Sequence, residues 1–382
     1  MKTSPISPVI VVLMWLLTCA GQAACIEVNS VNTPGDASAS FVISQPGSYC
    51  LANNVVGESG KSGIRIDADN VTLDLAGFAM LGGSGSLNGI LINNHLRIAI
   101  RNGSISSWGS NGLDGTSGGE ARLDDLRAEG NTGSGLIINS GSQVTNCVAG
   151  ANGGVGISTS NDVLVIGCLS GGNGSHGFLL GTASTIKGSF ASGNGGAGIA
   201  PSGVNSLTVI DCNAHLNTGT GIAGPNRALI TSSTAAENGS GGITAAASST
   251  ISNCNASGNT GVGIFASIGS AITGCTASAN TGDGIEVDSR CRLEGNTCQG
   301  NGAGTGDGAG IHVTGRGSRI DGNTALSNDR GIDIDAGGNL VVRNDATNNV
   351  VNYDIVAGNT NANVESPGAN FVITRPWVNF LH

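Results

Sequence analysis

Residues 131–178 contain three copies of one motif, Asn131-Thr-Gly-Ser-Gly-Leu136, Asn152-Gly-Gly-Val-Gly-Ile157 and Asn173-Gly-Ser-His-Gly-Phe178. Each copy has the form Asn-x-x-x-Gly followed by an apolar residue, and successive copies are 21 residues apart. The motif continues, at spacings of 21 or 23 residues, in copies that end at Ile199, Ile222, Ile243, Ile264 and Ile285. A repeat this short cannot bury an apolar face alone, so its copies must stack on one another as a solenoid.

The apolar residue that ends the motif marks one position of the repeat along the whole chain. Beyond the copies above, this marker is predicted at Ile64, Ile90, Leu113, Ile311, Ile332 and Ile355. Around the markers, apolar residues alternate with period two, as in Ile285-Glu286-Val287-Asp288, which is typical of strands. Short strands separated by Gly, Asn and Ser turns predict an all-β parallel β-helix of about 13–14 rungs, with three strands per coil and a cap at each end.

Two columns of polar residues have a structural explanation. Asn tolerates left-handed turn geometry, and inward-facing copies can hydrogen-bond from rung to rung. A second column indicates a small, weakly polar, buried side chain, because it holds Cys147, Cys168, Cys212, Cys254, Cys275, Ser189, Ser233, Asn296, Asn323 and Asn344. Stacked rungs lie ~4.8 Å apart, which would let Cys147–Cys168 and Cys254–Cys275 bridge. Parallel side chains make that geometry awkward, so we expect free thiols.

The first 24 residues have the pattern of a signal peptide. Lys2 supplies a charge, Val9 to Leu17 an apolar stretch, and residues 21–24 a small-residue cleavage region. No later segment is long and apolar enough to span a bilayer. We therefore expect a soluble, secreted or periplasmic protein without a membrane span.

The ends of a solenoid must be covered, because they would otherwise expose strand edges and core. Residues 25–50 are predicted to form the N-terminal cap, held by a Cys25–Cys50 disulfide, and residues 51–358 the β-helix. Residues 359–382 are predicted to form the C-terminal cap, because they contain Phe371, Trp377 and Phe380. The net charge of −10 argues against a nucleic acid partner, and we expect a monomer.

Two early segments resemble a known group of proteins. Residues 41–51 (FVISQPGSYCL) and 63–77 (GIRIDADNVTLDLAG) look like the opening of exported bacterial right-handed parallel β-helix proteins. The later Gly-Ile repeats and the ending Pro376-Trp-Val-Asn-Phe380 are similar to the pectate-lyase-like superfamily. The resemblance covers nearly all of the chain after residue 24. It implies right-handed coiling, which parallel crossovers generally show, and an association with carbohydrate.

Three rungs near the C-terminal end differ from the others on their predicted outer face. The marker and the residue two later point inward, so the residues one, three and five after the marker face solvent. At these positions the rungs that begin at Ile285, Ile311 and Ile332 carry Glu286, Asp288, Arg290, His312, Thr314, Arg316, Asp333 and Asp335. The corresponding positions between Leu136 and Ile264 hold almost no acid, base or nucleophile.

This arrangement predicts a candidate catalytic site. Glu286 and Asp333 should flank His312, with their Cα atoms about 10 Å apart, and should raise its pKa. Two carboxylates at that separation, with an imidazole between them, can perform acid–base work on a glycosidic bond, so Glu286, His312 and Asp333 are the catalytic candidates. The predicted substrate-binding residues are Asp288, Arg290, Thr314, Arg316 and Asp335, and the two arginines suit an acidic sugar.

Two other interpretations of these rungs stay open. Asp288, Asp333 and Asp335 offer oxygen ligands for Ca²⁺, whereas a plain exposed charge ladder would only make weak surface pairs. Asp307, in a glycine-rich insertion, is predicted to form one wall of the site. His95, Arg101 and Trp108 form a minor alternative sugar site.

Three classes of function therefore remain. The resemblance implies a polysaccharide lyase, hydrolase or epimerase that acts on the outer face of the coil. A non-catalytic glycan-binding protein or adhesin is the second class, and a structural cell-envelope protein is the third. Whether the chain is an enzyme is left open by the sequence, and a polysaccharide or surface glycan is the expected partner.

Overall fold

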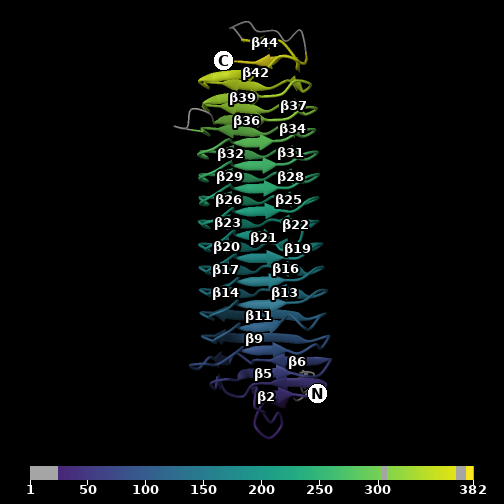
Figure 1. Ribbon diagram of the computed structural model, residues 1–382, viewed down its shortest axis with the longest axis vertical. Coiled ribbons are helices and arrows are strands. Elements are labelled where there is room, and N and C mark those ends of the chain that lie inside the picture. Colours follow the sequence, from purple (N-terminus) through teal and green to yellow (C-terminus); the bar gives the residue numbers. More distant parts are fainter. Residues whose placement is uncertain (1–24, 303–307, 367–375, 382) are drawn as a thin grey trace, which may run out of the picture.

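The computed structural model describes residues 25–302, 308–366 and 376–381, and within them every regular element is a β-strand. The strands stack into a long column of parallel coils, with the N-terminal coils at one end and the C-terminal coils at the other (Figure 1). The signal-peptide segment predicted at residues 1–24 lies outside the described residues. No helix long and apolar enough to cross a membrane occurs in the described part of the chain.

One face of the column is a single fifteen-stranded parallel sheet to which each coil contributes one strand. Its strands, in stacking order, are β2 (Ala39–Ile43), β5 (Ser62–Ile66), β8 (Ile90–Ile92), β10 (Leu113–Gly115), β12 (Leu136–Ile138), β15 (Ile157–Thr159), β18 (Phe178–Leu180), β21 (Ile199–Pro201), β24 (Ile222–Gly224), β27 (Ile243–Ala245), β30 (Ile264–Ala266), β33 (Ile285–Val287), β36 (Ala309–Val313), β39 (Arg330–Ile334) and β42 (Val351–Ile355).

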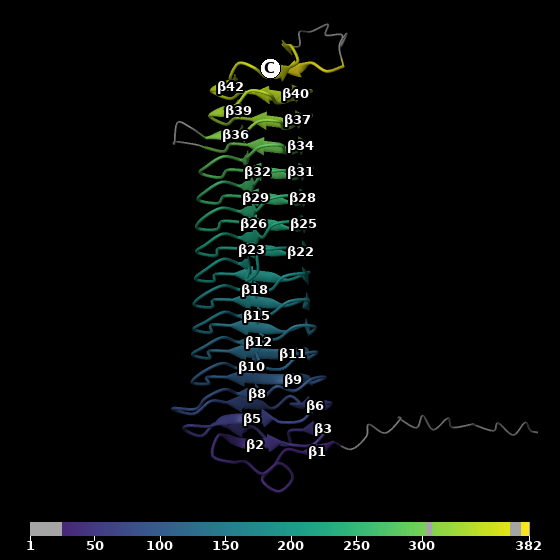
Figure 2. The same ribbon diagram turned by 45° about the vertical axis from the view of Figure 1, so that its right-hand side comes forward.

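The other two sides of each coil form two files of strands that belong to one thirty-stranded sheet (Figure 2). The first file contains β1 (Ile26–Glu27), β3 (Gly47–Cys50), β6 (Val71–Asp74), β13 (Gln143–Thr145), β16 (Leu164–Ile166), β19 (Ser184–Lys187), β22 (Leu207–Ile210), β25 (Leu229–Thr231), β28 (Thr250–Ser252), β31 (Ala271–Thr273), β34 (Arg292–Glu294), β37 (Arg319–Asp321), β40 (Leu340–Val342) and β43 (Thr360–Asn361). The second contains β4 (Val55–Val56), β7 (Ala79–Leu81), β14 (Val148–Gly150), β17 (Leu169–Gly171), β20 (Phe190–Ser192), β23 (Asn213–His215), β26 (Thr234–Ala236), β29 (Asn255–Ser257), β32 (Thr276–Ser278), β35 (Thr297–Gln299), β38 (Thr324–Leu326), β41 (Asp345–Thr347), β44 (Val364–Glu365) and β45 (Asn379–Phe380). The long strands β9 (Ala99–Ser106) and β11 (Arg122–Glu129) pair with members of both files.

The predicted parallel β-helix with three strands per coil is confirmed. The fifteen-stranded sheet adds one strand to the marker series, because β2, from the segment predicted as the N-terminal cap, pairs with β5. One marker was assigned wrongly. Ile332 pairs with Tyr353, so Tyr353 occupies the marker position of β42, and Ile355 lies two residues beyond it.

The markers form the core of the column. Every marker from Ile64 to Ile332 is fully buried, and the side chains between inward-facing residues point outward. The glycine before each marker from Ile64 to Ile332 is required by close packing between coils. A Cβ atom at Gly135, for example, would lie 2.7 Å from Nδ2 of Asn152 in the next coil.

The predicted asparagine ladder runs through the middle of the protein. Asn131 Nδ2 donates to Asn152 Oδ1 at 2.9 Å, and Asn152 Nδ2 donates to Asn173 Oδ1 at the same distance. The series continues coil by coil to Asn349. Each amide also donates to a backbone carbonyl, as Asn152 does to Ala128 at 3.0 Å. The ladder therefore satisfies polar groups that stacking removes from water.

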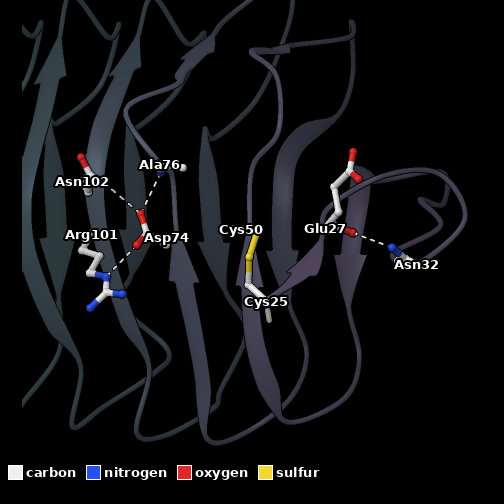
Figure 3. Close-up of a disulfide and its surroundings, with 8 residues drawn as sticks. All are labelled: Cys25, Glu27, Asn32, Cys50, Asp74, Ala76, Arg101 and Asn102. Carbon is white, nitrogen blue, oxygen red and sulfur yellow. Dashed lines mark hydrogen bonds and ion pairs between the residues drawn. A yellow bond between two sulfur atoms is a disulfide. The ribbon is translucent and has the colours of Figure 1, made fainter. Parts of the chain in front are cut away.

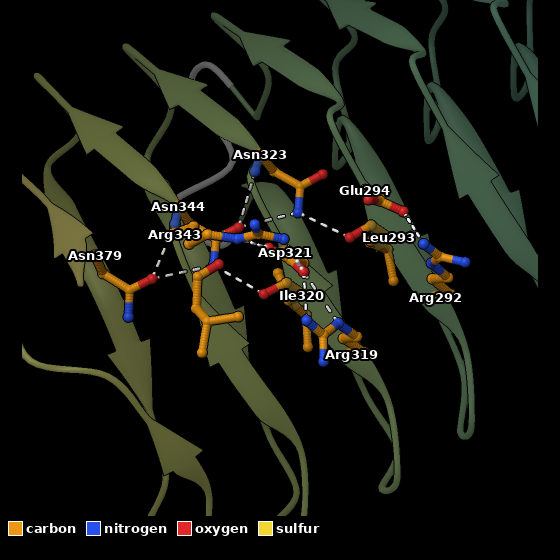
Figure 4. Close-up of polar contacts among 11 residues, drawn as sticks. Arg292, Leu293, Glu294, Arg319, Ile320, Asp321, Asn323, Arg343, Asn344 and Asn379 are labelled. Atoms are coloured by element: carbon orange, nitrogen blue, oxygen red, sulfur yellow. Dashed lines mark hydrogen bonds and ion pairs between the residues drawn. The ribbon is translucent and has the colours of Figure 1, made fainter. Parts of the chain in front are cut away.

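The column of cysteine, serine and asparagine is also as predicted. Cys147, Cys168, Cys212, Cys254 and Cys275 are buried free thiols, as are Cys291 and Cys298. In the C-terminal coils the column becomes a second asparagine ladder. It runs from Asn296 through Asn323 and Asn344 to Asn379 in β45, and Figure 4 shows the last three.

Both ends are tied to the column by specific contacts. The predicted Cys25–Cys50 disulfide is present, with a Cα–Cα distance of 5.7 Å, and it joins the start of the described chain to β3 (Figure 3). At the other end Val378 and Asn379 are buried, whereas Trp377 is 52% exposed and lies under the guanidinium of Arg343. Phe371, predicted to be part of the C-terminal cap, lies outside the described residues.

Candidate active site

The charged residues predicted from the sequence lie together on three neighbouring coils. In the fifteen-stranded sheet Glu286 pairs with His312, and His312 pairs with Asp333, so the predicted file of side chains is confirmed. We call Glu286, Asp288, His312, Asp333 and Asp335 the acidic patch. Strands β36 and β39, which carry His312 and Asp333, lie near the C-terminal end of the column in Figure 1.

His312 lies between two carboxylates, but they are not the two expected. Its Nδ1 is 2.9 Å from Oδ2 of Asp283, and its Nε2 is 3.1 Å from Oδ2 of Asp335. The hydrogen bond to Asp283, followed by the one to Asp335, raises the pKa of His312 to about 9, although burial opposes the shift. In this arrangement His312 is an imidazolium at neutral pH and donates a hydrogen bond from each ring nitrogen.

Asp283 is a site residue that the sequence analysis missed. It lies in the turn before β33, is 9% exposed, and accepts a hydrogen bond from the backbone N–H of Ala309 at 2.6 Å. The repeat motif contained a signal that could have identified Asp283, because this residue is the only acid at its position of the motif. At the same position the seven preceding copies have Ser134, Val155, His176, Ala197, Thr220, Gly241 and Val262, none of them acidic.

Glu286 is a partly buried carboxylate, and Asp333 is a buried one. Burial raises the pKa of Glu286, and the nearby charge of Asp283 adds to the shift. Burial also raises the pKa of Asp333, which is 5% exposed. Arg330 donates from Nη1 to Asp333 Oδ2 at 3.0 Å and lies 3.3 Å, through Nε, from Asp354 Oδ2. Asp354, the next residue in the file, was also missed.

The predicted substrate-binding residues fall into two groups. Asp288 accepts a hydrogen bond from Ser267 Oγ at 2.7 Å, and the hydroxyl of Thr314 lies within 3.5 Å of its other oxygen. Arg290 and Arg316 are exposed on adjacent coils, where the backbone N–H of Arg290 donates to the carbonyl of Arg316. Neither arginine makes an ion pair with any residue in the described part of the chain, so both guanidinium groups face solvent.

A metal-ligand set occurs in the patch, but it differs from the predicted calcium set. Ligand atoms of His312, Asp333 and Asp335 lie within 4.8 Å of one another. Asp288 is not a member of this set, and its Oδ2 accepts a hydrogen bond from Ser267 Oγ. Asp307, predicted as one wall of the site, lies outside the described residues.

Other residues singled out from the sequence do not form a sugar site. Trp108 is fully buried, and its indole N–H donates to the carbonyl of Met80 at 3.1 Å, so it cannot offer a face to a ligand. His95 bonds to Asp69, and Arg101 to Asp74 (Figure 3 shows the latter pair). The minor alternative of a His95–Arg101–Trp108 site is therefore wrong.

A small cavity of about 250 Å³ lies far from the acidic patch, beside the long strands β9 and β11. It is lined by Gly77, Asn102, Gly103, Ser104, Asp125, Leu126, Arg127, Asn146 and Val148. None of these residues was predicted as a catalytic candidate, and we assign the cavity no role.

The chain matches the family model of a known fold. Residues 88–224 and 184–325 match the family model described as a right-handed beta helix region, and together they span more than half of the 382 residues. No curated protein sequence matches the chain significantly.

Several solved structures are similar in shape. The A-module of the Azotobacter vinelandii mannuronan C-5 epimerase AlgE6 is 15% identical, with a TM-score of 0.47, over 83% of this chain and 91% of that one. A variant of the periplasmic alginate epimerase AlgG is 12% identical, with a TM-score of 0.41, over 93% and 80%. The Dettilon tailspike protein is 13% identical, with a TM-score of 0.36, over 87% and 61%. Identities this low assign no activity to the present chain.

Proposed function

Because the chain belongs to the right-handed β-helix family, we propose that it is a carbohydrate-associated protein whose elongated outer face binds a polysaccharide. We further propose that the acidic patch hydrolyses a glycosidic bond of that polysaccharide. A β-helix supports many activities, so the proposal depends on the site and not on the fold.

The observation that carries the proposal is the relation between Glu286 and Asp333. They lie in one file, two rungs apart with His312 between them. Two rung spacings put their Cα atoms about 10 Å apart. Inverting glycosidases hold their two carboxyl groups about 6.5–9.5 Å apart, which leaves room for a water molecule, whereas retaining enzymes hold them about 5–5.5 Å apart. Side chains on Cα atoms this far apart can reach the inverting range, so the arrangement supports direct hydrolysis with inversion.

The two carboxyl groups have different surroundings, and this suggests their roles. Glu286 is half-buried, its pKa is raised, and it makes no ion pair within the described residues, so it can retain a proton and donate it to the leaving oxygen. Asp333 is oriented by Arg330 and can accept a proton from the attacking water. His312, held by Asp283 and Asp335, places a positive charge between them.

Arg290 and Arg316 suggest the kind of sugar. They are exposed neighbours at the edge of an otherwise acidic patch, and a guanidinium pair of this kind suits the carboxylate of a uronic acid. We propose a polysaccharide that contains uronic acid units, with the arginines binding a unit next to the cleaved bond.

The test is a screen of uronic-acid and neutral polysaccharides, in which reducing ends report hydrolysis and absorbance of unsaturated products reports a lyase. We expect new reducing ends without unsaturated products. Hydrolysis that persists unchanged in Glu286→Gln would contradict the assigned site. If unsaturated products appear, the reaction is an elimination and the proposal of hydrolysis is wrong.

Glycan binding without catalysis is the second candidate, and one feature of the outer face favours it. From β12 to β30 the residue after each marker is uncharged: Ile137, Ser158, Leu179, Ala200, Ala223, Thr244 and Phe265. This long neutral stretch can contact a polymer in many weak places. Retention on immobilised polysaccharides that is equal for the wild type and Glu286→Gln, with no product released, would select this candidate.

We also propose export to the periplasm or the cell exterior. The Cys25–Cys50 disulfide supports it, because disulfides persist in oxidising compartments. The seven other cysteines of the described chain are buried, which protects their thiols from oxidation.

A further inference from the structure

We propose that His312, Asp333 and Asp335 bind one divalent transition-metal cation, such as Zn²⁺ or Mn²⁺. Their ligand atoms lie within 4.8 Å of one another. His312 lies in β36, Asp333 lies in the adjacent strand β39, and Asp335 directly follows β39. This is the one such group of His, Cys, Asp or Glu side chains found among the residues that the structure describes.

The pair His312 and Asp335 already has the separation of two metal ligands. Nε2 of His312 and Oδ2 of Asp335 are 3.1 Å apart. Zinc–nitrogen and zinc–oxygen bonds are about 2.0–2.2 Å long, so two ligands at right angles on one cation are about 3 Å apart. A cation can therefore replace the proton between these atoms with little side-chain movement, and the proton leaves to solvent.

Asp283 prepares His312 for this role. Metal-bound histidines almost always donate the other ring N–H to a carboxylate or carbonyl, which fixes the tautomer and the ring orientation. Here Nδ1 of His312 bonds to Asp283 at 2.9 Å, and the second oxygen of Asp283 is held by the backbone N–H of Ala309. Nε2 is thereby directed at Asp335.

Asp333 is also held in place before any ligand binds. It is 5% exposed, and Arg330 Nη1 lies 3.0 Å from its Oδ2. No hydrogen bond to its Oδ1 occurs within the described residues, so this oxygen is the one we assign to the cation. Asp335, with a side chain that is 57% exposed, supplies the ligand at the solvent side.

The charge of the cluster favours a cation. Five carboxylates lie around His312 and Arg330, which are the two cationic side chains of the ion pairs here. The carboxylates are Asp283, Glu286, Asp333, Asp335 and Asp354. Partial burial makes this excess negative charge costly. A divalent ion would reduce that cost.

The donor set selects the kind of metal. One imidazole nitrogen and two carboxylate oxygens suit Zn²⁺, Mn²⁺ or Fe²⁺, whereas Ca²⁺ takes six to eight oxygen ligands. Three protein ligands leave positions open for water or a sugar hydroxyl. The effect of the cation on catalysis rests on the proposed function. If the patch hydrolyses a glycosidic bond, the bound cation would activate the attacking water in place of Asp333, and Glu286 would remain the proton donor.

Metal binding to the full-length mature protein, freed of metal by chelation, tests the inference without any substrate. Zn²⁺, Mn²⁺ and Ca²⁺ are titrated separately by calorimetry, and Co²⁺ is followed by its visible absorption. We expect one Zn²⁺ or Mn²⁺ per chain, Ca²⁺ binding at least tenfold weaker, and a Co²⁺ spectrum that shows nitrogen ligation.

The variants are chosen to separate binding from folding. Asp335→Asn changes an exposed residue and should weaken Zn²⁺ binding at least tenfold, and Asp283→Asn should do so through the orientation of His312. His95→Ala is the matched control, because His95 also bonds through Nδ1 to an aspartate, Asp69, but belongs to no group of three possible metal ligands among the described residues. It should bind Zn²⁺ as the wild type does. Unfolding curves verify that each variant is folded.

Absence of stoichiometric binding, or equal binding by the wild type and Asp335→Asn, would overturn the metal site. The same experiments test the proposed hydrolysis independently of the metal site. A protein that binds Zn²⁺ but cleaves no polysaccharide keeps the metal site and loses the activity, whereas metal-free hydrolysis unaffected by chelation keeps the activity and loses the metal site.

Discussion

Oδ2 of Asp283 lies 2.9 Å from Nδ1 of His312, although the two residues are 29 positions apart in the chain. Asp283 belongs to the turn before β33, and His312 belongs to β36 in the next coil. The contact joins a motif position that holds no acid in the seven preceding copies to the one histidine of the acidic patch. It makes the protonation of His312 the most direct probe of the patch.

The first prediction concerns that protonation in the metal-free protein. NMR titration of His312 should give a pKa of about 9 in the wild type, and Asp283→Asn should bring it down toward the usual value of about 6.5. The bond to Asp283 is the largest cause of the shift. A value near 6.5 in the wild type would contradict the geometry of the patch.

The same shift predicts how stability depends on pH. The folded pKa of His312 is raised, so its stabilising contribution is complete below about pH 6.5 and is lost as pH rises through about 9. The contribution should be about 3 kcal/mol. Urea unfolding at pH 6 and pH 10 measures it, and His312→Gln should reduce the difference between the two conditions.

Glu286→Gln should have opposite effects on activity and stability. Burial raises the pKa of Glu286, so its ionised form is unfavourable in the folded protein, and the neutral amide should increase stability at pH 7 by less than about 1 kcal/mol. Loss of the proton donor should lower kcat about 100-fold or more. Glu294→Gln, on the other sheet, serves as control for both measurements and should leave kcat unchanged. A Glu286→Gln protein that is less stable and equally active would show that Glu286 has only a structural role.

Asn194 tests the ladder that holds the coils together. It is fully buried, and its Nδ2 donates to Asn217 Oδ1 at 2.9 Å and to the carbonyl of Ser170 at 3.1 Å. Asn194→Ala removes the acceptor of the Asn173 N–H and the side-chain donor to the carbonyl of Ser170, whereas Asn217 Oδ1 keeps the backbone N–H of residue 194. Each buried unpaired group costs about 1–3 kcal/mol, so we expect a loss of about 2 kcal/mol or more in chemical unfolding. The exposed Ser192→Ala, two residues away, should lose less than about 0.5 kcal/mol.

The C-terminal end is fastened by a buried carboxylate. Asp321 is 2% exposed and is held by Arg319 and Arg343, and Arg343 lies over Trp377 (Figure 4 shows the three charged residues). The hydrogen bond to Arg343 is the main reason that the pKa of Asp321 is lowered. Its contribution is therefore present above about pH 4 and is lost as pH falls below that value.

Asp321→Asn should lower stability by about 2 kcal/mol, because it leaves two partly exposed arginines without their shared partner. The fluorescence emission of Trp377 should also change in this variant. The emission of Trp108 can be told apart from it, because Trp108 is fully buried in another coil. Asp345→Asn, one rung beyond, is the control. Unchanged Trp377 emission in Asp321→Asn would show that the arginines do not hold the terminal segment.

The repeat itself determined most of the fold. The markers from Ile64 to Ile332 occupy the positions predicted for them, because a 21-residue period leaves one way to superpose apolar residues, glycines and asparagines at once. The file Glu286–His312–Asp333 followed from the same register. The predicted register is wrong only in the last coil, where the Asn-x-x-x-Gly motif is no longer present. There the marker was predicted at Ile355, but Tyr353 occupies the position.

Contacts across turns were decided by the tertiary structure alone. Period-two alternation states which side of a strand a residue faces, but it does not state how far a turn residue reaches toward the next coil. Asp283 therefore escaped prediction, as did the pairing of Arg330 with Asp333 and Asp354. Likewise Trp108 was predicted as part of a minor alternative sugar site, although its side chain is buried in the core and its backbone N–H donates to Asn131, the first residue of the asparagine ladder. The sequence by itself determined the stacked coils and the file of charged residues, since both follow from repetition, whereas only the folded coils decided which carboxylates contact His312, since that depends on turn geometry and side-chain reach.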